Sequence, residues 1–346
     1  MNPFEHSEYD DHEHVSFFSD PAVGLRAIVA IHNTGPLGLA GGGCRFRAYE
    51  TAADALTDVL RLSKAMSYKL ALARIPSGGA KSVVMADPRR DKTPELLRAL
   101  GRAVDRLGGK YVIAEDVGTT AADMEVIGET TNYVVGKSAD TTPPTAYGTF
   151  LGLRRGVARK LERTLENVHV AVQGVGGVGR HLTRLLVEAG ARVTVADVDD
   201  GAVADVVKAY GVEWARPEAI YDVDADVFAP CALGAILNDD TIPRLRTRVV
   251  AGGANNQLAE PKHERDLHER GILYLPDFVL NMGGVLGAAA AGMSGDADTS
   301  SPEALAACER VVEVLDAAFA RAQETSSSVT NAAEELAREA IAEQKR

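Results

Sequence analysis

Apolar and polar positions alternate along the first half of the chain between short runs typical of strands and longer runs typical of helices. Residues 26–32 predict a strand, and residues 51–66 carry apolar side chains at helical spacing. Two more strands are predicted at residues 83–85 and 111–114, with a helix over residues 93–107 between them. This alternation predicts an α/β fold, in which ligands gather at the carboxyl ends of the strands.

The second half of the chain repeats the alternation more clearly. Ser301 opens a long predicted helix that continues through Phe319, and a Ser-rich break at residues 325–328 precedes a last helix over residues 331–344. The predicted strands of this half are residues 168–173, 192–196, 226–228, 248–251 and 272–275.

The length of the chain favours two domains. A single hydrophobic core seldom serves 346 residues. The run Thr-Thr-Pro-Pro-Thr at residues 141–145 interrupts the pattern, so we predict a first domain over residues 1–143 and a second over residues 144–328. Residues 329–346 form a C-terminal helix that is expected to pack back on the first domain.

The composition is that of an ordinary globular protein, with 46% hydrophobic and 25% charged residues. A formal net charge of −12 disfavours nucleic acid and anionic membrane as partners, because both reward positive patches. No run approaches the length of a membrane span, and the N-terminus lacks the features of a secretory signal. Three widely spaced cysteines favour a reduced, cytoplasmic protein over a disulfide framework.

A glycine-rich turn follows the strand predicted at residues 168–173. Its motif is GxGxxG, and a helix and a second strand follow it; its residues are Gly174, Val175, Gly176, Gly177, Val178 and Gly179. Asp197 ends that second strand at the spacing expected for a carboxylate that binds the ribose of a dinucleotide. Because such a carboxylate repels a 2′-phosphate, the motif predicts NAD rather than NADP as the cofactor.

Two lysines and one aspartate stand beside small residues and form the candidate chemical site. Lys81 follows Ser-Gly-Gly-Ala, Lys69 follows Met-Ser-Tyr, and Asp116 precedes Val-Gly. Oxidative deamination of an amino acid needs these groups beside a nicotinamide. One amine can hold the substrate carboxylate, the other can activate water or polarise the reacting carbon, and the carboxylate can carry the proton.

Several sequence blocks in one order resemble the amino-acid dehydrogenase superfamily, and within it the leucine, phenylalanine and valine dehydrogenase branch. These blocks are residues 42–45, 66–69, 78–81, 114–120, 144–148, 173–176, 228–234 and 254–258. The resemblance implies an N-terminal α/β substrate-binding and oligomerisation domain and a C-terminal Rossmann NAD-binding domain, separated by a cleft. It also implies a homo-oligomer that converts a hydrophobic L-amino acid reversibly to its 2-oxo acid and ammonia.

The resemblance also implies roles for individual residues. Lys69 would bind the substrate carboxylate, Lys81 would be the catalytic lysine, and Asp116 would transfer the proton. The backbone of two glycines, Gly42 and Gly43, would line the substrate site. On the second domain, Thr145 would support the nicotinamide carboxamide and Asn255 would lie between cofactor and substrate; the loop at residues 137–144 is shorter than in leucine enzymes.

The side chain of the substrate is only partly predicted. Glutamate enzymes carry a lysine where this chain has Gly41, so a glutamate side chain would enter the pocket unpaired. The resemblance places Val285 and Ala288 on one pocket wall, with Gly41 and Ala114 opposite. These mostly small residues favour aromatic or long aliphatic substrates. Met282, where relatives usually carry alanine, would refill part of that volume, so leucine, valine, phenylalanine and tryptophan all stay open.

Two other functions compete with this interpretation. A nucleotide-sensing binding protein would keep the dinucleotide motif without the chemistry, and a hydroxy-acid dehydrogenase would need a histidine as acid and base. No histidine stands in a matching motif; the N-terminal ones, His6, His12 and His14, are interpreted as part of a solvated tail. The cysteines show no zinc spacing, so no metal is predicted.

Overall fold

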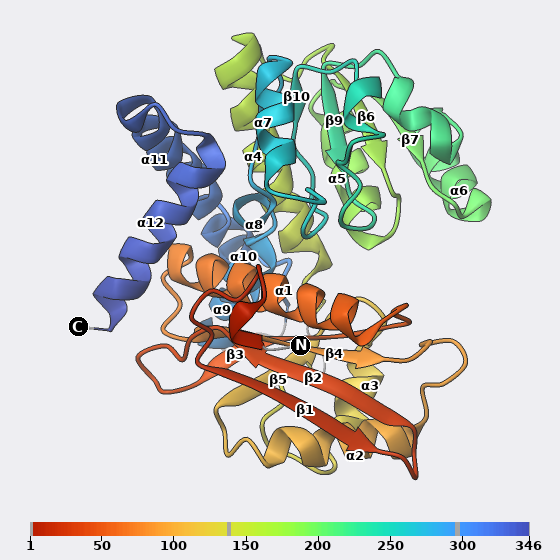
Figure 1. Ribbon diagram of the computed structural model, residues 1–346. Coiled ribbons are helices and arrows are strands. Elements are labelled where there is room, and N and C mark those ends of the chain that lie inside the picture. Colours follow the sequence, from red (N-terminus) through yellow and green to blue (C-terminus); the bar gives the residue numbers. More distant parts are fainter. Residues whose placement is uncertain (1–2, 137–139, 295–297, 346) are drawn as a thin grey trace. The chain divides into compact units, whose positions relative to one another are not determined.

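The computed structural model describes residues 3–136, 140–294 and 298–345 (Figure 1). The chain forms two compact units: the first unit contains Met1–Ala139 together with Ala337–Arg346, and the second unit contains Asp140–Leu336. The last helix, α12 (Val329–Gln344), therefore begins in the second unit and ends in the first.

The first unit is built on a mixed five-stranded sheet with the order β1-β2-β4-β3-β5. The β1–β2 and β2–β4 pairs are antiparallel, whereas β3 runs parallel to both β4 and β5. The strands are β1 (His14–Asp20), β2 (Leu25–Ile31), β3 (Ala40–Arg47), β4 (Gly78–Met85) and β5 (Tyr111–Glu115).

Helices cover both faces of this sheet (Figure 1). On β2, Ile28 and Ala30 pack with α1, while Val29 and Ile31 on the opposite face pack in the core that includes α2 and α3. This alternation follows from the two-residue period of a strand, and both faces are apolar because both are covered. The helices are α1 (Ala52–Leu72), α2 (Pro94–Asp105) and α3 (Ala121–Ile127), with a short 3-10 helix at Pro3–Glu5.

Lys81 lies in the middle of β4, because this strand begins at Gly78. The sequence prediction began that strand at residue 83, because the small residues before it carry no apolar signal. Gly78 and Gly79 nevertheless pair with β3. Glycine is needed at residue 79 because α1 lies so close that a Cβ there would collide with the backbone of Ser67. The helix itself continues to Leu72, beyond the predicted residue 66, so Lys69 is helical.

His12 is buried, so the interpretation of the N-terminal histidines as a solvated tail is wrong for this residue. Its side chain Nε2 lies 3.1 Å from the carbonyl oxygen of Leu60 and 3.0 Å from Oγ of Ser63. Burial lowers the pKa of His12 to about 4, which keeps the ring neutral at pH 7. Both partners lie some fifty positions away on α1, and the polar composition of the N-terminus contains no sign of them.

The second unit is built on a parallel six-stranded sheet with the order β11-β10-β9-β6-β7-β8. Numbered within the unit, this is the 3-2-1-4-5-6 order of the dinucleotide-binding Rossmann fold. The expected fold class is thus confirmed. The strands are β6 (His169–Gln173), β7 (Arg192–Ala196), β8 (Glu213–Trp214), β9 (Val227–Pro230), β10 (Val249–Val250) and β11 (Leu273–Tyr274).

The helices of the second unit depart from the prediction at two places. The run at residues 141–145 does not interrupt the structure: it contains the first turn of α4, where proline is favoured. The predicted long helix from Ser301 is two helices, because hydrogen bonds around Cys308 tighten from four-residue to three-residue spacing. The helices are α4 (Thr142–Leu161), α5 (Gly177–Glu188), α6 (Asp200–Tyr210), α7 (Lys262–Glu269), α8 (Asp277–Leu280), α9 (Gly283–Ser294), α10 (Pro302–Ala307) and α11 (Arg310–Thr325), with 3-10 helices at Pro217–Asp222 and Ile242–Arg244.

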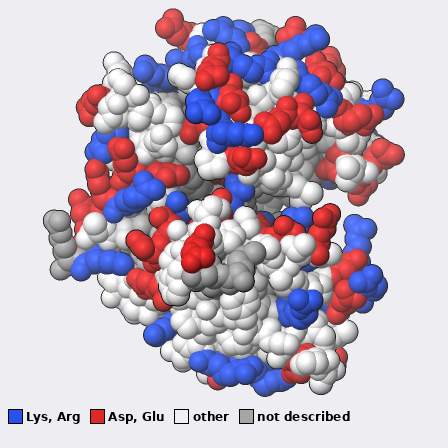
Figure 2. All heavy atoms as spheres, in the orientation of Figure 1, with Lys and Arg blue, Asp and Glu red and all other residues white. Residues whose placement is uncertain are grey.

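Charges of both signs share the visible surface. Figure 2 shows Lys and Arg interspersed with Asp and Glu over the face in view, rather than gathered into a stripe of one sign. Within the described parts of the chain, each helix is too short or too polar to cross a bilayer.

The three glycines of β3 differ in the space around them, which gives a first prediction. A Cβ on Gly42 would collide with the carbonyl oxygen of Ala80, whereas the nearest described atom to a Cβ on Gly41 is Oγ of Ser77 at 3.7 Å. Gly42→Ala is therefore expected to lower the free energy of unfolding by about 1–3 kcal/mol through overpacking. The matched control Gly41→Ala should stay within about 0.5 kcal/mol of the wild type. Urea denaturation measures both, and equal losses would contradict the packing described here.

Candidate active site

The two sequence-predicted catalytic side chains meet within the first unit. Nζ of Lys81 on β4 lies 3.0 Å from Oδ2 of Asp116, which directly follows β5. Strand β3 separates β4 from β5, and the residue of β3 in register with Lys81 is Gly43, which pairs with Ala114 on the other side. A Cβ on Gly43 would lie only 2.8 Å from Cβ of Asp116. The glycine thus leaves the gap across which lysine and aspartate reach each other.

Asp116 contacts a second cation that the sequence analysis did not identify as functional. Nε of Arg45 lies 3.4 Å from the same Oδ2 atom, and Nη1 of Arg45 donates to both carboxylate oxygens of Asp58 at 3.1 Å. The hydroxyl of Tyr49 donates to Asp58 at 2.7 Å. One signal was available in the sequence: Asp58 is a carboxylate within the stretch of α1 that contributes Leu56, Val59 and Leu60 to the core.

These ion pairs are almost fully withdrawn from water. The side chains of Lys81 and Asp116 are 10% and 8% exposed. Burial alone would raise the pKa of Asp116, but the charges of Lys81 and then Arg45 outweigh it and hold that pKa well below the usual range. Asp116 is therefore an anion at every pH at which the protein is expected to work.

Backbone contacts fix the position of this carboxylate. The N–H of Asp116 donates to Oγ1 of Thr119 at 2.9 Å, and that hydroxyl donates to the carbonyl oxygen of Cys44 at 3.0 Å. Thr120, not Asp116, caps the following helix α3. The side chain of Asp116 therefore takes no part in capping α3.

Lys69 lies half-buried on α1, three residues after Met66 and on the same face of the helix. The side chain of Met66 comes within 3.5 Å of the position that a Cβ on Gly42 would take. This face of α1 therefore borders the glycines of β3. The site role of Lys69 stays a prediction, as do those of Gly41, which is half-buried, and Ala114 on β5.

The glycine-rich turn of the second unit lies where the sequence placed it, between β6 and α5. Gly174 has a positive φ of 94°, which favours glycine. A Cβ on Gly179 would collide with the carbonyl oxygen of Gly174, so this glycine allows close packing of helix on turn. No described atom lies within 4 Å of the Cβ position of Gly176. The turn therefore leaves open backbone at the N-terminus of α5, where a pyrophosphate fits.

Asp197 follows β7 and contacts this turn. Its Oδ2 accepts from the N–H of Val175 at 2.7 Å, and its Oδ1 accepts from the N–H of Asp199 at 3.1 Å. Each carboxylate oxygen still has acceptor capacity for a ribose hydroxyl. Gly177 and Val178 belong to the first turn of α5.

Two further residues of the second unit have polar atoms that fit a nicotinamide. The hydroxyl of Thr145 donates to the carbonyl oxygen of Thr141 at 2.7 Å, which leaves its oxygen free to accept from an amide. The buried Asn281, which the sequence analysis did not single out, donates through Nδ2 to Oδ1 of Asn255 at 2.9 Å. Because the amide oxygen of Asn255 accepts this bond, its amide nitrogen points away from Asn281, where it can donate to another group.

The residues expected on a pocket wall lie on or next to α9. Val285 and Ala288 are half-buried on this helix, three positions apart on one face, and Met282 just before it is fully buried. Of the loop at residues 137–144, residues 137–139 lie outside the described residues. Residues 142–144 form the start of α4.

Comparisons with known proteins identify the family of the chain. The dimerisation-domain model of the Glu/Leu/Phe/Val dehydrogenases matches residues 12–133, and the Glutamate/Leucine/Phenylalanine/Valine dehydrogenase model matches residues 200–346. The chain belongs to this amino-acid dehydrogenase family. Leucine dehydrogenase of Geobacillus stearothermophilus is 42% identical over 99% of this chain and 94% of its own. Valine dehydrogenase of Streptomyces coelicolor is 42% identical over 98% of this chain and 94% of its own.

A solved structure extends the similarity to the fold. The crystal structure of L-tryptophan dehydrogenase from Nostoc punctiforme has a TM-score of 0.78 and 40% sequence identity, with 97% of each chain covered. The protein is therefore an amino-acid dehydrogenase of the hydrophobic-substrate branch, as the sequence blocks indicated. Members of this family use NAD or NADP.

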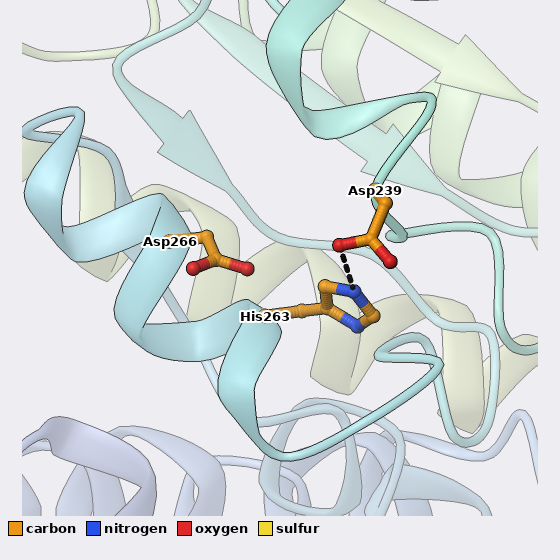
Figure 3. A group of neighbouring side chains, drawn as sticks. All are labelled: Asp239, His263 and Asp266. Atoms are coloured by element: carbon orange, nitrogen blue, oxygen red, sulfur yellow. Dashed lines mark hydrogen bonds and ion pairs between the residues drawn. The ribbon is translucent and has the colours of Figure 1, made fainter.

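One group of side chains in this dehydrogenase has the composition of a metal site (Figure 3). His263 and Asp266 come from α7, and Asp239 comes from a loop. Nδ1 of His263 accepts from the N–H of Glu260 at 2.9 Å, and its Nε2 lies 3.4 Å from Asp239. Lys262 donates to the same carboxylate at 3.0 Å. These contacts explain why the three side chains lie together: they stabilise the beginning of α7.

Cys44 and Cys308 are buried, and Cys231 is half-buried. Burial raises the pKa of Cys44 to about 12 and that of Cys231 to about 11, so both thiols stay protonated. Neither offers a thiolate nucleophile.

The buried pair gives a prediction of stability and its pH dependence. Asp116→Asn leaves Lys81 as an uncompensated buried cation and removes one of the two carboxylates that face Arg45. It is expected to cost about 3–5 kcal/mol in the free energy of unfolding at pH 7. Because the pKa of Asp116 is lowered in the folded state, its contribution is complete above the unfolded value of about 4 and decreases as the pH falls below it. Urea denaturation from pH 7 to pH 3 should thus show the difference shrinking with acid.

The matched control is Glu129→Gln, which removes an exposed carboxylate 2.7 Å from Arg98. It should cost at most about 1 kcal/mol. A loss for Asp116→Asn no larger than this control would contradict a buried, doubly paired carboxylate.

Proposed function

We propose that this dehydrogenase oxidatively deaminates a hydrophobic L-amino acid with NAD, reversibly, giving the 2-oxo acid and ammonia. The observation that carries the proposal is the buried contact of Lys81 with Asp116, 3.0 Å across the gap at Gly43. A buried amine beside a carboxylate can handle both proton steps of deamination, and such pairs are kept from water only at some cost in stability. The family of the chain supports the same chemistry.

The roles follow from the chemistry of each group. Asp116 accepts a proton from the substrate ammonium, because only the free amine can push electrons toward the α-carbon as hydride leaves. NAD, when bound, supplies the hydride acceptor. Lys81, once it has given up its own proton, takes one from the water that attacks the resulting iminium. Asp116 then passes its proton to the amine nitrogen and receives the hydroxyl proton as the carbon–nitrogen bond breaks, the carbonyl forms and ammonia leaves. Lys69 holds the substrate carboxylate as a point charge, and the backbone of Gly42 and Gly43 lines the substrate.

The coenzyme is held by the second unit in this proposal. The pyrophosphate lies on the turn from Gly174 to Gly179, where open backbone at Gly176 supports close approach. Asp197 accepts from the ribose hydroxyls, and its charge repels a 2′-phosphate, which favours NAD over NADP. Thr145 and Asn255 bind the nicotinamide end.

The substrate side chain is proposed to be apolar and not that of glutamate. Gly41 offers no charge to a second carboxylate, and the space beside it holds a neutral atom, Oγ of Ser77. Ala114 on the first unit, and Val285 and Ala288 on the second, are likewise apolar residues that suit an apolar substrate side chain. Relatives named leucine, valine and tryptophan dehydrogenase support the class without selecting one member.

The cellular setting is also a proposal. Three free, largely buried cysteines support the reduced environment of the cytoplasm. The match of residues 12–133 to a dimerisation domain supports a homo-oligomer, whose size a mass measurement in solution will determine.

A panel of the twenty amino acids with NAD and with NADP tests the function directly. We expect the absorbance of the reduced coenzyme to rise with NAD and one or more of leucine, valine, phenylalanine and tryptophan at alkaline pH. Glutamate should be inert, and NADP should be poor. Tight NADH binding without turnover would instead identify a nucleotide-sensing protein, and reduction of a 2-oxo acid without ammonia would identify a hydroxy-acid dehydrogenase.

Two alanine variants separate the roles of the lysines. Lys81→Ala should lower kcat by at least about 10²-fold while NADH still binds, because general acid–base catalysis supplies about 10²–10⁴-fold. Lys69→Ala should act mainly on KM, since it removes a contact made in both the ground and the transition state. Steady-state kinetics and NADH fluorescence measure these changes. Equal, mild effects of both substitutions are incompatible with the assigned roles.

A further inference from the structure

Arg45 is a buried, charged residue to which the proposed mechanism assigns no role. Arg45 lies on β3, two positions after Gly43, and only 8% of its surface is exposed. Its Nε lies 3.4 Å from Oδ2 of Asp116, the same oxygen that receives Nζ of Lys81 at 3.0 Å. One carboxylate oxygen is thus shared by two cations.

Arg45 donates hydrogen bonds to Asp58 and not to Asp116. Nη1 reaches both oxygens of Asp58 at 3.1 Å, whereas the buried Nε forms no hydrogen bond of acceptable geometry within the described structure. Tyr49 holds Asp58 from the other side at 2.7 Å. Arg45 is therefore fixed in place by α1 and acts on Asp116 through its charge.

We propose that Arg45, anchored by Asp58, is a positioning residue that holds the Asp116 carboxylate toward Lys81 and sets the pH at which the Lys81–Asp116 pair gives up its proton. This inference rests on the proposed function of the pair. The cation opposes retention of a proton by the pair, because it stabilises the more negative state of its neighbours. Asp58 weakens this effect, because its carboxylate neutralises part of the positive charge of Arg45.

The other titratable groups around Arg45 do not compete. Burial, and next the charge of Asp58, raise the pKa of Tyr49 far above neutrality, and the guanidinium of Arg47 stacks over its ring at 5.1 Å. The pKa of Cys44 is raised to about 12. Among the ion pairs described by the structure, the charges that face one another here near neutral pH are Arg45 on β3, Asp58 on α1, Lys81 on β4 and Asp116 after β5.

The test is the pH profile of kcat/KM for the full-length enzyme with NAD and its best amino acid. The acid limb of this profile reports proton loss from the coupled pair, not from either residue alone. Arg45→Gln removes a positive charge and should shift the acid limb upward by about one pH unit or more. Arg45→Lys retains the charge and should restore most of the shift, although it loses the fork that binds Asp58.

Asp58→Asn provides the opposite sign and a second route if Arg45→Gln does not fold. It removes a negative charge while an amide can still accept from Arg45, so the acid limb should move downward, by less than the Arg45→Gln shift. The control is Arg98→Gln, which removes a cation of the same unit that pairs with Glu129 and should leave the profile unchanged.

The outcomes are distinguishable. Shifts of opposite sign for Arg45→Gln and Asp58→Asn support the inference, because loss of packing alone lowers the active fraction without moving the limb. Profiles that superimpose on the wild type, or that shift in one direction for both variants, would overturn it. Absence of wild-type turnover on every amino acid would instead reject the proposed function on which it rests.

Discussion

A charged pair kept away from water is the constraint around which the first unit is organised. Lys81 lies on β4 and Asp116 directly follows β5, and β3 lies between these two strands. Because adjacent strands are about 4.8 Å apart, the two backbones are separated by about two strand spacings. The residue between them is Gly43, where a Cβ would collide with the carbonyl oxygen of Glu115 and with Cβ of Asp116. Arg45 adds the second cation that compensates burial of the carboxylate.

The second unit uses glycine for a related purpose. At Gly174 and Gly179 the missing side chains let a helix begin directly on a strand, and at Gly284 the missing side chain makes room for the hydroxyl of Thr145. In both units, therefore, the absence of a Cβ on glycine lets a neighbouring backbone segment or polar side chain come close. Substitution at these positions acts first on packing and only then on chemistry.

The sequence predicted the type and order of most elements and both halves of the ion pair. Strand β7 was predicted to the residue, because Val193 and Val195 alternate with the exposed Arg192 and the polar Thr194, and Gly190 follows the end of the preceding helix. Arg45 and Asp58 were missed as a pair because thirteen positions and a change from strand to helix separate them. Their contact arises only when α1 packs on the sheet, which no local pattern contains. His12 was misassigned for the same reason, since its partners are on α1.

Catalytic groups of this kind act on atoms that all amino acids share, so they cannot choose among side chains. Discrimination then depends on apolar contacts, where one methylene is worth about 1–3 kcal/mol, or roughly 10–200-fold. Relatives named for leucine, valine and tryptophan, all 40–42% identical to this chain, fit that view. Lys81, Asp116 and Arg45 form a polar cluster within the first unit that offers no such apolar contact. Under the proposed function, the side chain is therefore selected by residues outside this cluster, while the cluster itself serves every member of the substrate class.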